Sequence, residues 1–210
     1  MNFSDTYKFI WWSTGGAATR SVAGIFQQGF DLKTDKEGEI LVDSAGSHDV
    51  GIPNNCPDDY KIICNVRNPY SWYVSSFTDL DMESLRETGK RLDFTEYVKK
   101  TNGYDFNVSI QDRWEGIRAP DYFIKMEDIR GSIENMPVQQ PLPDIDWDLH
   151  KENYYKHKDD KSKSHREYDE NGVRCDWKKY YNQELADIVY NEPRMKEMFE
   201  LTGYKKDSWK

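Results

Sequence analysis

One short apolar run followed by an arginine and a proline limits the fold of this chain more than any other feature. The run Lys61–Val66 (Lys-Ile-Ile-Cys-Asn-Val) is bounded by polar residues, which predicts a buried strand. Asn68 and Pro69 end the strand, and proline suits the first turn of a helix. Arg67 therefore stands at the carboxyl edge of a strand, and Ser75 follows about two helical turns later. Such a guanidinium and hydroxyl suit a phosphate group at the edge where open α/β sheets bind ligands. A turn whose arginine pairs with a surface acid is an equally good interpretation of the same residues.

A second segment with a strand, a loop and a helix lies near the start of the chain. Residues 7–12 are rich in strand-forming side chains and run into a loop of small residues, after which a helix is expected over about 19–29. The backbone N–H groups of such a loop and helix start attract anions. The pattern Gly-x4-Gly-Lys-Ser/Thr is absent, which counts against a kinase driven by ATP or GTP. A simple tight turn explains the loop equally well.

Strand and helix candidates alternate along the rest of the chain. Further strands are predicted over 39–43 and 121–126, and further helices over 94–100 and 180–199. Glu127 and Asp128 open a short helix, and Pro193 begins a last helix that stops at Gly203. Alternating strands and helices predict an α/β protein with a largely parallel sheet. A length of 210 residues suits a single domain, 1–210.

Composition excludes several classes of protein. The net charge of −9 counts against a nucleic-acid binder, which would carry a basic face. Cys56, Cys64 and Cys175 are odd in number and widely spaced, so neither a disulfide framework nor a metal site of the zinc type is indicated. The sequence shows no membrane span and no signal peptide, so a cytoplasmic location is expected.

Four segments, taken in order, resemble one enzyme family. Arg67-Asn-Pro-Tyr…Ser75 resembles the segment that binds the 3′-phosphate in sulfotransferases that use 3′-phosphoadenosine-5′-phosphosulfate (PAPS). Residues 122–129 are similar to the family's apolar strand ending in Glu-Asp-Leu, and residues 180–204 to the C-terminal helices of its compact bacterial and viral members. The fourth segment is the first loop. The resemblance implies a three-layer α/β/α fold with a central parallel sheet, of the P-loop nucleotide-hydrolase type.

The first loop takes the place of the family's 5′-phosphosulfate loop, with one departure. Aligned on Val22, the family's basic position falls on Gly16 and its usual glycine on Ala18, so Arg20 is the candidate replacement cation. Basic residues at 161, 163, 166 and 174 are candidates, without a unique alignment, for a stretch that closes over the 3′-phosphate in the family, and a solvated charge run is the better explanation of any single one of them. The resemblance thus implies a nucleotide site of Thr14, Gly15, Gly16, Ala17, Ala18, Thr19, Arg20, Ser21, Arg67, Ser75, Lys161 and Arg174.

His48 is the candidate general base. It lies in a loop of glycine and serine ahead of the phosphate-binding strand, where cytosolic sulfotransferases place a catalytic histidine. Asp49 and Glu127 are the runners-up. Residues 79–120 are expected to form an acceptor-side insertion, and residues 137–172 a loop or lid. Trp114, Tyr104 and Phe106, with Tyr97, offer rings that could stack on a sugar.

The resemblance implies transfer of a sulfuryl group from PAPS to a hydroxyl or amine of a small molecule or glycan. Arg20 and His48 would be catalytic, 3′-phosphoadenosine-5′-phosphate (PAP) would be the product, and no metal would be needed. Two alternatives stay open. The missing basic residue at Gly16 suggests a nucleotide- or glycan-binding protein that has lost transfer, and a small-molecule kinase on the same sheet is less well supported. The sequence leaves the acceptor and the oligomeric state open.

Overall fold

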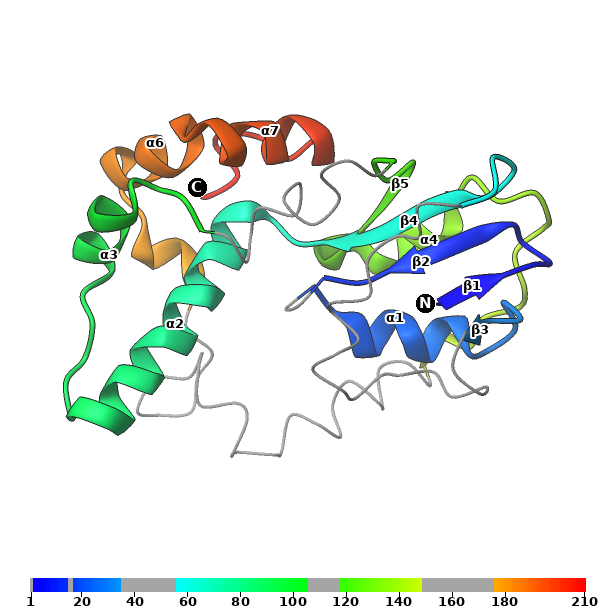
Figure 1. Ribbon diagram of the computed structural model, residues 1–210, viewed down its shortest axis with the longest axis horizontal. Helices are drawn as coiled ribbons and strands as arrows, with labels where there is room; N and C mark the ends of the chain where they lie inside the picture. Colours follow the sequence, from blue (N-terminus) through cyan, green and yellow to red (C-terminus); the bar gives the residue numbers. More distant parts are fainter. Residues whose placement is uncertain (1, 15–16, 35–55, 106–117, 149–175) are drawn as a thin grey trace. The chain divides into compact units, whose positions relative to one another are not determined.

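The structure is a computed structural model, and it describes residues 2–14, 17–34, 56–105, 118–148 and 176–210 (Figure 1). The chain falls into two compact units. The first combines residues 1–67 and 113–157, and the second combines 68–112 and 158–210. The single domain expected for 1–210 stays a prediction.

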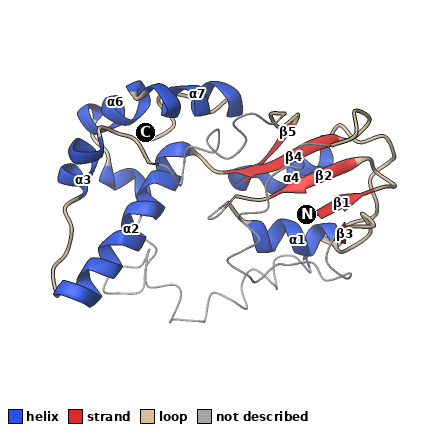
Figure 2. Ribbon diagram, viewed as in Figure 1, coloured by secondary structure: helices blue, strands red, loops and turns tan. Residues whose placement is uncertain are grey.

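The first unit is built on a five-stranded sheet in the order β3-β1-β2-β4-β5 (Figure 2). Its strands are β1 (Asn2–Ser4), β2 (Phe9–Trp12), β3 (Lys33–Thr34), β4 (Lys61–Val66) and β5 (Tyr122–Lys125). Strands β2, β4 and β5 are parallel, as the alternation of elements predicted. The antiparallel strands β1 and β3 at the other edge were not predicted. They are three and two residues long, too short for a periodic pattern to show in the sequence. The α/β class is confirmed.

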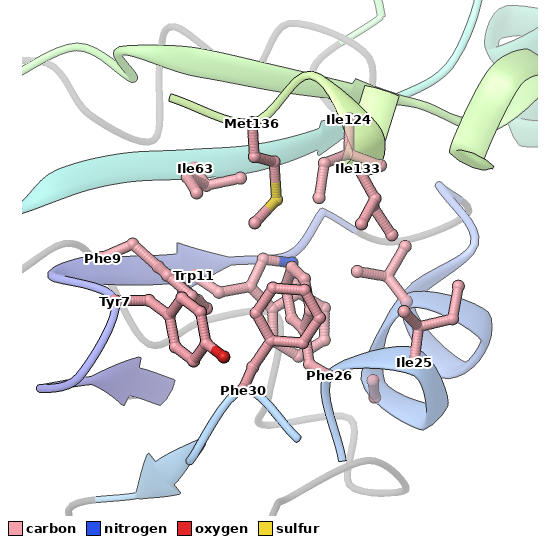
Figure 3. Close-up of a cluster of buried hydrophobic side chains, with 12 residues drawn as sticks. Tyr7, Phe9, Trp11, Ile25, Phe26, Phe30, Ile63, Ile124, Ile133 and Met136 are labelled. Atoms are coloured by element: carbon pink, nitrogen blue, oxygen red, sulfur yellow. The ribbon is translucent and has the colours of Figure 1, made fainter. Parts of the chain in front are cut away.

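One face of the sheet carries an aromatic and aliphatic core. Phe9, Trp11 and Ile63 from the strands pack with Phe26 of α1 (Thr19–Phe26) and Ile133 of α4 (Ile129–Glu134) (Figure 3). The strand residues alternate along their strands, so α1 and α4 lie on the same face. The alternate positions, Ile10, Trp12, Ile62, Cys64 and Val66, are at most 4% exposed. Burial on both faces is typical of parallel strands in α/β proteins.

Residues 137–148 belong to the expected loop and are fixed to the core of the first unit. Gly29 has a φ of 149°, and a Cβ there would meet Pro143 at 2.9 Å, so only glycine allows this close approach. The backbone N–H of Asp146 donates to Gln28 Oε1 at 2.9 Å. The Arg130 guanidinium lies 5.3 Å from the centre of the Trp147 ring. Residues 149–172, the other part of the predicted loop or lid, lie outside the described residues.

The second unit is helical. Its elements are α2 (Pro69–Thr88), α3 (Phe94–Thr101), the 3-10 helix η4 (Trp177–Tyr180), α6 (Gln183–Asn191) and α7 (Pro193–Thr202). Their core is aromatic: Tyr70 contacts both Tyr181 and Phe199, and Phe77 contacts Phe94. The predicted start at Pro193 is confirmed, and Gly203 ends α7 with a φ of 70°. Residues 79–88, the start of the expected acceptor-side insertion, are the second half of α2, and the insertion stays a prediction.

The short helix predicted after β5 is also present. A 3-10 turn, η3 (Met126–Asp128), leads into α4, and Asp128 Oδ1 caps it by accepting from Gly131 N at 3.0 Å. Among the described residues, no helix is both long and apolar enough to cross a membrane.

Candidate anion-binding site

Parallel strands β2 and β4 bring the first loop and Arg67 to the same edge of the first unit's sheet. The register pairs Trp12 with Cys64, so the residues that follow each strand emerge side by side. The Thr14 hydroxyl donates to the backbone carbonyl of Asn65 at 2.9 Å, which ties the loop to the end of β4. Arg67 is the next residue but one. The first loop and Arg67 were predicted separately, and both lie at the carboxyl edge of the sheet.

Helix α1 opens at this edge without a side-chain cap. Its N-cap, Ala18, has φ 60° and ψ 32° and makes no side-chain hydrogen bond to the helix. Non-glycine residues rarely adopt this left-handed conformation, and it costs about 1–2 kcal/mol. The start of a helix carries backbone N–H donors and the positive end of the helix dipole. An anion placed there would be stabilised by both.

The hydroxyls of the loop are engaged within the protein. Thr14 donates to Asn65 O, and Thr19 Oγ1 donates to the carbonyl of Thr14 at 3.2 Å. Ser13 Oγ lies 2.5 Å from Thr19 Oγ1. A hydroxyl has one hydrogen to donate. In this conformation Thr14 and Thr19 therefore hold the loop, so the backbone N–H groups of the first turn are the candidate donors to an anion, and half-buried Ser21 belongs to the same turn.

Arg67 is the predicted basic site residue whose side chain lies within the described part of the structure. It is 5% exposed, and the alternative of a turn whose arginine pairs with an acid stays open. The turn after it matches the prediction, because Asn68 Oδ1 accepts from Tyr70 N at 3.0 Å and Pro69 takes the first helical position. Ser75 is half-buried on α2. Arg67 closes the first unit and Ser75 belongs to the second, so their convergence on one phosphate stays a prediction.

Lys125 is a basic residue at this edge that the sequence analysis passed over. It is the last residue of β5, and the register pairs it with Val66, directly before Arg67. Its backbone N–H donates to Ser132 Oγ at 3.1 Å. The sequence carried a signal, because Lys125 is the last residue but one of the strand predicted over 121–126.

Several predicted site residues lie outside the described part of the structure. They are Gly15, Gly16, His48, Phe106, Trp114, Lys161 and Arg174, together with Asp49, Lys163 and Arg166. The backbone of Arg20 lies in the first turn of α1, and its side chain is likewise outside the description. The general base and the replacement cation thus stay predictions.

Of the predicted acceptor-side rings, Tyr97 and Tyr104 are described, and both belong to the second unit. Tyr97 donates to the buried carboxylate of Asp105 at 3.0 Å and packs on Phe77, as a core residue does. Its burial and the neighbouring Asp105 carboxylate raise the pKa of the Tyr97 phenol. Tyr104 is half-buried, with the Arg194 guanidinium 5.8 Å from its ring centre. Glu127, a runner-up base, is exposed in η3, as an acid at a helix start would be.

A cavity of about 550 Å³ lies within the second unit, but its chemistry does not suit a phosphate. It is lined by Asn102, Glu184, Asp187, Ile188, Asn191, Glu192 and Pro193. Two of its three acids are paired, Glu184 with Lys99 at 2.9 Å and Asp187 with Lys206 at 2.7 Å. Carboxylates repel a second anion.

Within the described residues, no group of three His, Cys, Asp or Glu side chains could hold a metal ion. The candidate anion-binding site therefore consists of the loop residues Thr14, Ala17 and Ala18, the first turn of α1, and Arg67. Comparisons with protein-family models, with curated proteins and with solved structures gave no match to this chain.

Proposed function

We propose that this protein is a PAPS-dependent sulfotransferase that transfers a sulfuryl group to a hydroxyl or amine of a small-molecule or glycan acceptor. One observation carries the proposal. The uncapped start of α1 and the buried Arg67 lie at the carboxyl edge of two adjacent parallel strands. In open α/β sheets, ligands bind at this edge. The proposal includes the three-layer fold of the P-loop nucleotide-hydrolase type, of which the confirmed α/β class is the coarser part.

In this proposal the two ends of the nucleotide bind different groups. The first turn of α1 and the loop residues receive the 5′-phosphosulfate, and Arg67 binds the 3′-phosphate with Ser75, Lys161 and Arg174 as the further ligands. Arg67 is withdrawn from bulk water, which strengthens a charge-assisted contact with phosphate. Ala18 supports the alignment with the family, because the position where the family has glycine has a positive φ here.

The reaction follows from these roles. An acceptor oxygen or nitrogen attacks the sulfur of PAPS, and the bond from sulfur to the bridging phosphate oxygen breaks. PAP leaves with the electron pair of that bond, and the acceptor proton passes to His48. Arg20 and the N–H groups of the first turn stabilise the charge that develops on the leaving oxygen. Cationic side chains and backbone dipoles suffice for this step, so the proposal includes no metal.

A second function is favoured by two features of the first loop. The hydroxyls of Thr14 and Thr19 donate within the protein, and glycine stands at position 16 where the family has a basic residue. A protein with these features could bind the nucleotide and transfer sulfate slowly or not at all. A kinase lacks a comparable supporting observation, because the Walker lysine is absent from the sequence.

Thermal stabilisation by PAP tests the nucleotide site. A ligand that binds only the folded state adds about 2.7 kcal/mol at a hundred times its dissociation constant. PAP should raise the melting temperature of the wild type more than ATP, AMP or sulfate does, and Arg67→Ala should abolish the shift. Arg67→Lys keeps the charge but loses the two-pronged guanidinium, so it should recover only part of the shift.

Arg118→Ala is the matched control. Arg118 belongs to the same unit but precedes β5 and pairs with Asp121 at 2.7 Å, so its loss should leave the PAP shift intact. An equal shift with ATP, or no shift at all, would contradict the proposed function. Transfer of labelled sulfate from PAPS that falls in Arg20→Ala separates the enzyme from the binding protein.

A further inference from the structure

A polar side chain is buried near the carboxyl end of β4 in the first unit's sheet. Asn65 is the fifth residue of β4 and is fully buried, with 0% of its surface exposed. An amide in such a place is costly unless its hydrogen bonds are made. The Asn65 amide makes two, one to Trp11 and one to Ser13. Because Ser13 opens the first loop, Asn65 links the core of the sheet to the candidate anion-binding site.

The direction of these hydrogen bonds follows from donor chemistry. The indole nitrogen of Trp11 can only donate, so the atom that it meets at 2.9 Å must be the Asn65 oxygen. The Asn65 Nδ2 group therefore faces Ser13 Oγ, at 3.4 Å. Amide orientation is thus fixed by chemistry, where the two ends of an amide otherwise look alike.

The same reasoning extends into the loop. Thr19 Oγ1 donates its hydrogen to the carbonyl of Thr14, so it must accept at its contact with Ser13. Ser13 then donates to Thr19 and accepts from Asn65. The result is one directed chain, in which Trp11 donates to Asn65, Asn65 to Ser13, Ser13 to Thr19 and Thr19 to the backbone of Thr14. Hydrogen bonds in such a chain polarise and strengthen one another.

We propose that Asn65 is a positioning residue that holds the start of α1 in the conformation that binds the anion. This inference rests on the proposed function. These hydrogen bonds hold Ser13 and Thr14 on one side of the loop and Thr19 on the other. In this proposal they therefore determine the direction of the first-turn N–H groups. When the N–H donors are already fixed in the free protein, ligand binding does not have to order them and loses no conformational entropy there. Asn65 itself makes no contact with the ligand in this proposal.

Two sets of variants, one at Asn65 and one at Thr19, test this series of hydrogen bonds. Asn65→Leu keeps the approximate size of the side chain and removes both of its hydrogen bonds. At the other end, Thr19→Val removes the hydroxyl at constant shape, and Thr19→Ser restores it. The control is Ile63→Val, a buried apolar position two residues earlier on the same strand and the same face. Ile63 belongs neither to this series of hydrogen bonds nor to the candidate site.

Two measurements are made on the intact protein: the dissociation constant of PAP, and amide hydrogen exchange over residues 17–22. Asn65→Leu and Thr19→Val should each weaken PAP binding by roughly tenfold, the effect of about one lost hydrogen bond. Both should speed exchange at the start of α1 while exchange in β5 stays as in the wild type. Thr19→Ser should recover most of the binding and protection lost in Thr19→Val, and Ile63→Val should bind PAP and exchange as the wild type does.

The outcomes separate the two proposals. A wild type that does not bind PAP overturns the proposed function, and with it the anion-binding role of Asn65. If the wild type binds PAP, unchanged binding and exchange in Thr19→Val overturn the positioning role, even where Asn65→Leu fails to fold. Equal weakening in Ile63→Val would also overturn it, because general loss of stability would then explain the effect.

Discussion

Asn68 and Ser208 lie 140 positions apart in the sequence and are joined by a hydrogen bond of 2.9 Å from Asn68 Nδ2 to Ser208 Oγ. A second contact fixes the same region, because the Tyr70 hydroxyl donates to the backbone carbonyl of Lys206 at 2.8 Å. The last residues of the chain therefore close over the first turn of α2. This turn begins the helix that carries Ser75, a residue of the proposed 3′-phosphate site.

Asn68 stabilises this turn in two ways that mutation can separate. Asn68→Ala removes both the cap and the bond to Ser208, and we expect a loss of about 1–2 kcal/mol in the free energy of unfolding. Asn68→Asp keeps an acceptor for Tyr70 N and loses only the donor to Ser208, so its loss should be smaller. Urea denaturation measures both. Ser208→Ala should match Asn68→Asp, and a cost for Ser208→Ala as large as that of Asn68→Ala would contradict the capping role.

The buried hydroxyl of Tyr181 should matter more than a half-buried one. Tyr181 Oη donates to the carbonyl of Tyr70 at 3.0 Å in the aromatic core of the second unit. Tyr181→Phe leaves that carbonyl without its donor, and we expect a loss of about 1–3 kcal/mol. In the first unit, Tyr122 Oη donates to Ser132 O at 2.7 Å from a half-buried position, where water can replace it. Tyr122→Phe should therefore cost less, and equal costs in chemical denaturation would show that burial does not decide the effect.

Alkaline pH should unfold the protein through its buried tyrosines. Burial is the main cause that raises the pKa of four phenols of the second unit above the usual value near 10: Tyr70, Tyr73, Tyr97 and Tyr181. The unfolded chain loses these protons first, so it binds fewer protons than the folded chain and stability falls as pH rises above about 10. Below that pH the contribution is fully present.

Two titrations check this expectation. Tyrosinate absorbance should rise later in the folded protein than in the protein unfolded in urea, and the rise should coincide with loss of the circular dichroism signal. Tyr181→Phe removes one of the four phenols and should make the alkaline transition less steep. A folded protein whose tyrosines all titrate near pH 10 would contradict the burial of these hydroxyls.

Gly103 should tolerate a methyl group less well than Gly89, although both have a positive φ. A Cβ at Gly103 would meet the Ile188 carbonyl oxygen at 2.6 Å and Val189 Cα at 2.8 Å, both in the backbone of α6. At Gly89, no described atom lies within 4 Å of an added Cβ. Gly89→Ala should cost only the strain of its φ, about 1–2 kcal/mol. Gly103→Ala adds a collision with backbone that cannot rotate away, so its loss should be larger by about 1–3 kcal/mol. Thermal denaturation of the pair checks the difference.

The sequence predicted elements best where local chemistry defines both ends. The strand Lys61–Val66 was predicted with its observed bounds, because polar residues flank an apolar run and Asn68-Pro69 stops it. The last helix was predicted from Pro193 to the Gly203 stop for the same kind of reason. Helix α2 was predicted from its proline start, but its continuation to Thr88 was missed, because its surface is polar and only Gly89 marks its end.

The candidate site was also predictable from the sequence only in part. The sequence alone identified the first loop and Arg67 as separate candidates, and the resemblance placed Thr14 and Thr19 in the nucleotide site. In the folded structure both hydroxyls donate within the protein, and Asn65, more than forty residues away from either, bonds to Ser13 and to Thr14. A hydroxyl's partner depends on which atoms the fold brings within about 3 Å, and that distance has no local signature in the sequence.

The sequence by itself determined where β4 and α7 begin and end and which segment ends carry basic, hydroxyl and small residues, because caps, prolines and apolar periodicity act over a few neighbouring residues. Only the tertiary structure decided that β2 and β4 are neighbours, that Asn65 holds Ser13, and that Asn68 meets Ser208. These contacts join residues tens of positions apart. They form because packing of the apolar faces fixes the strands and helices in space, and the polar partners are set by that packing.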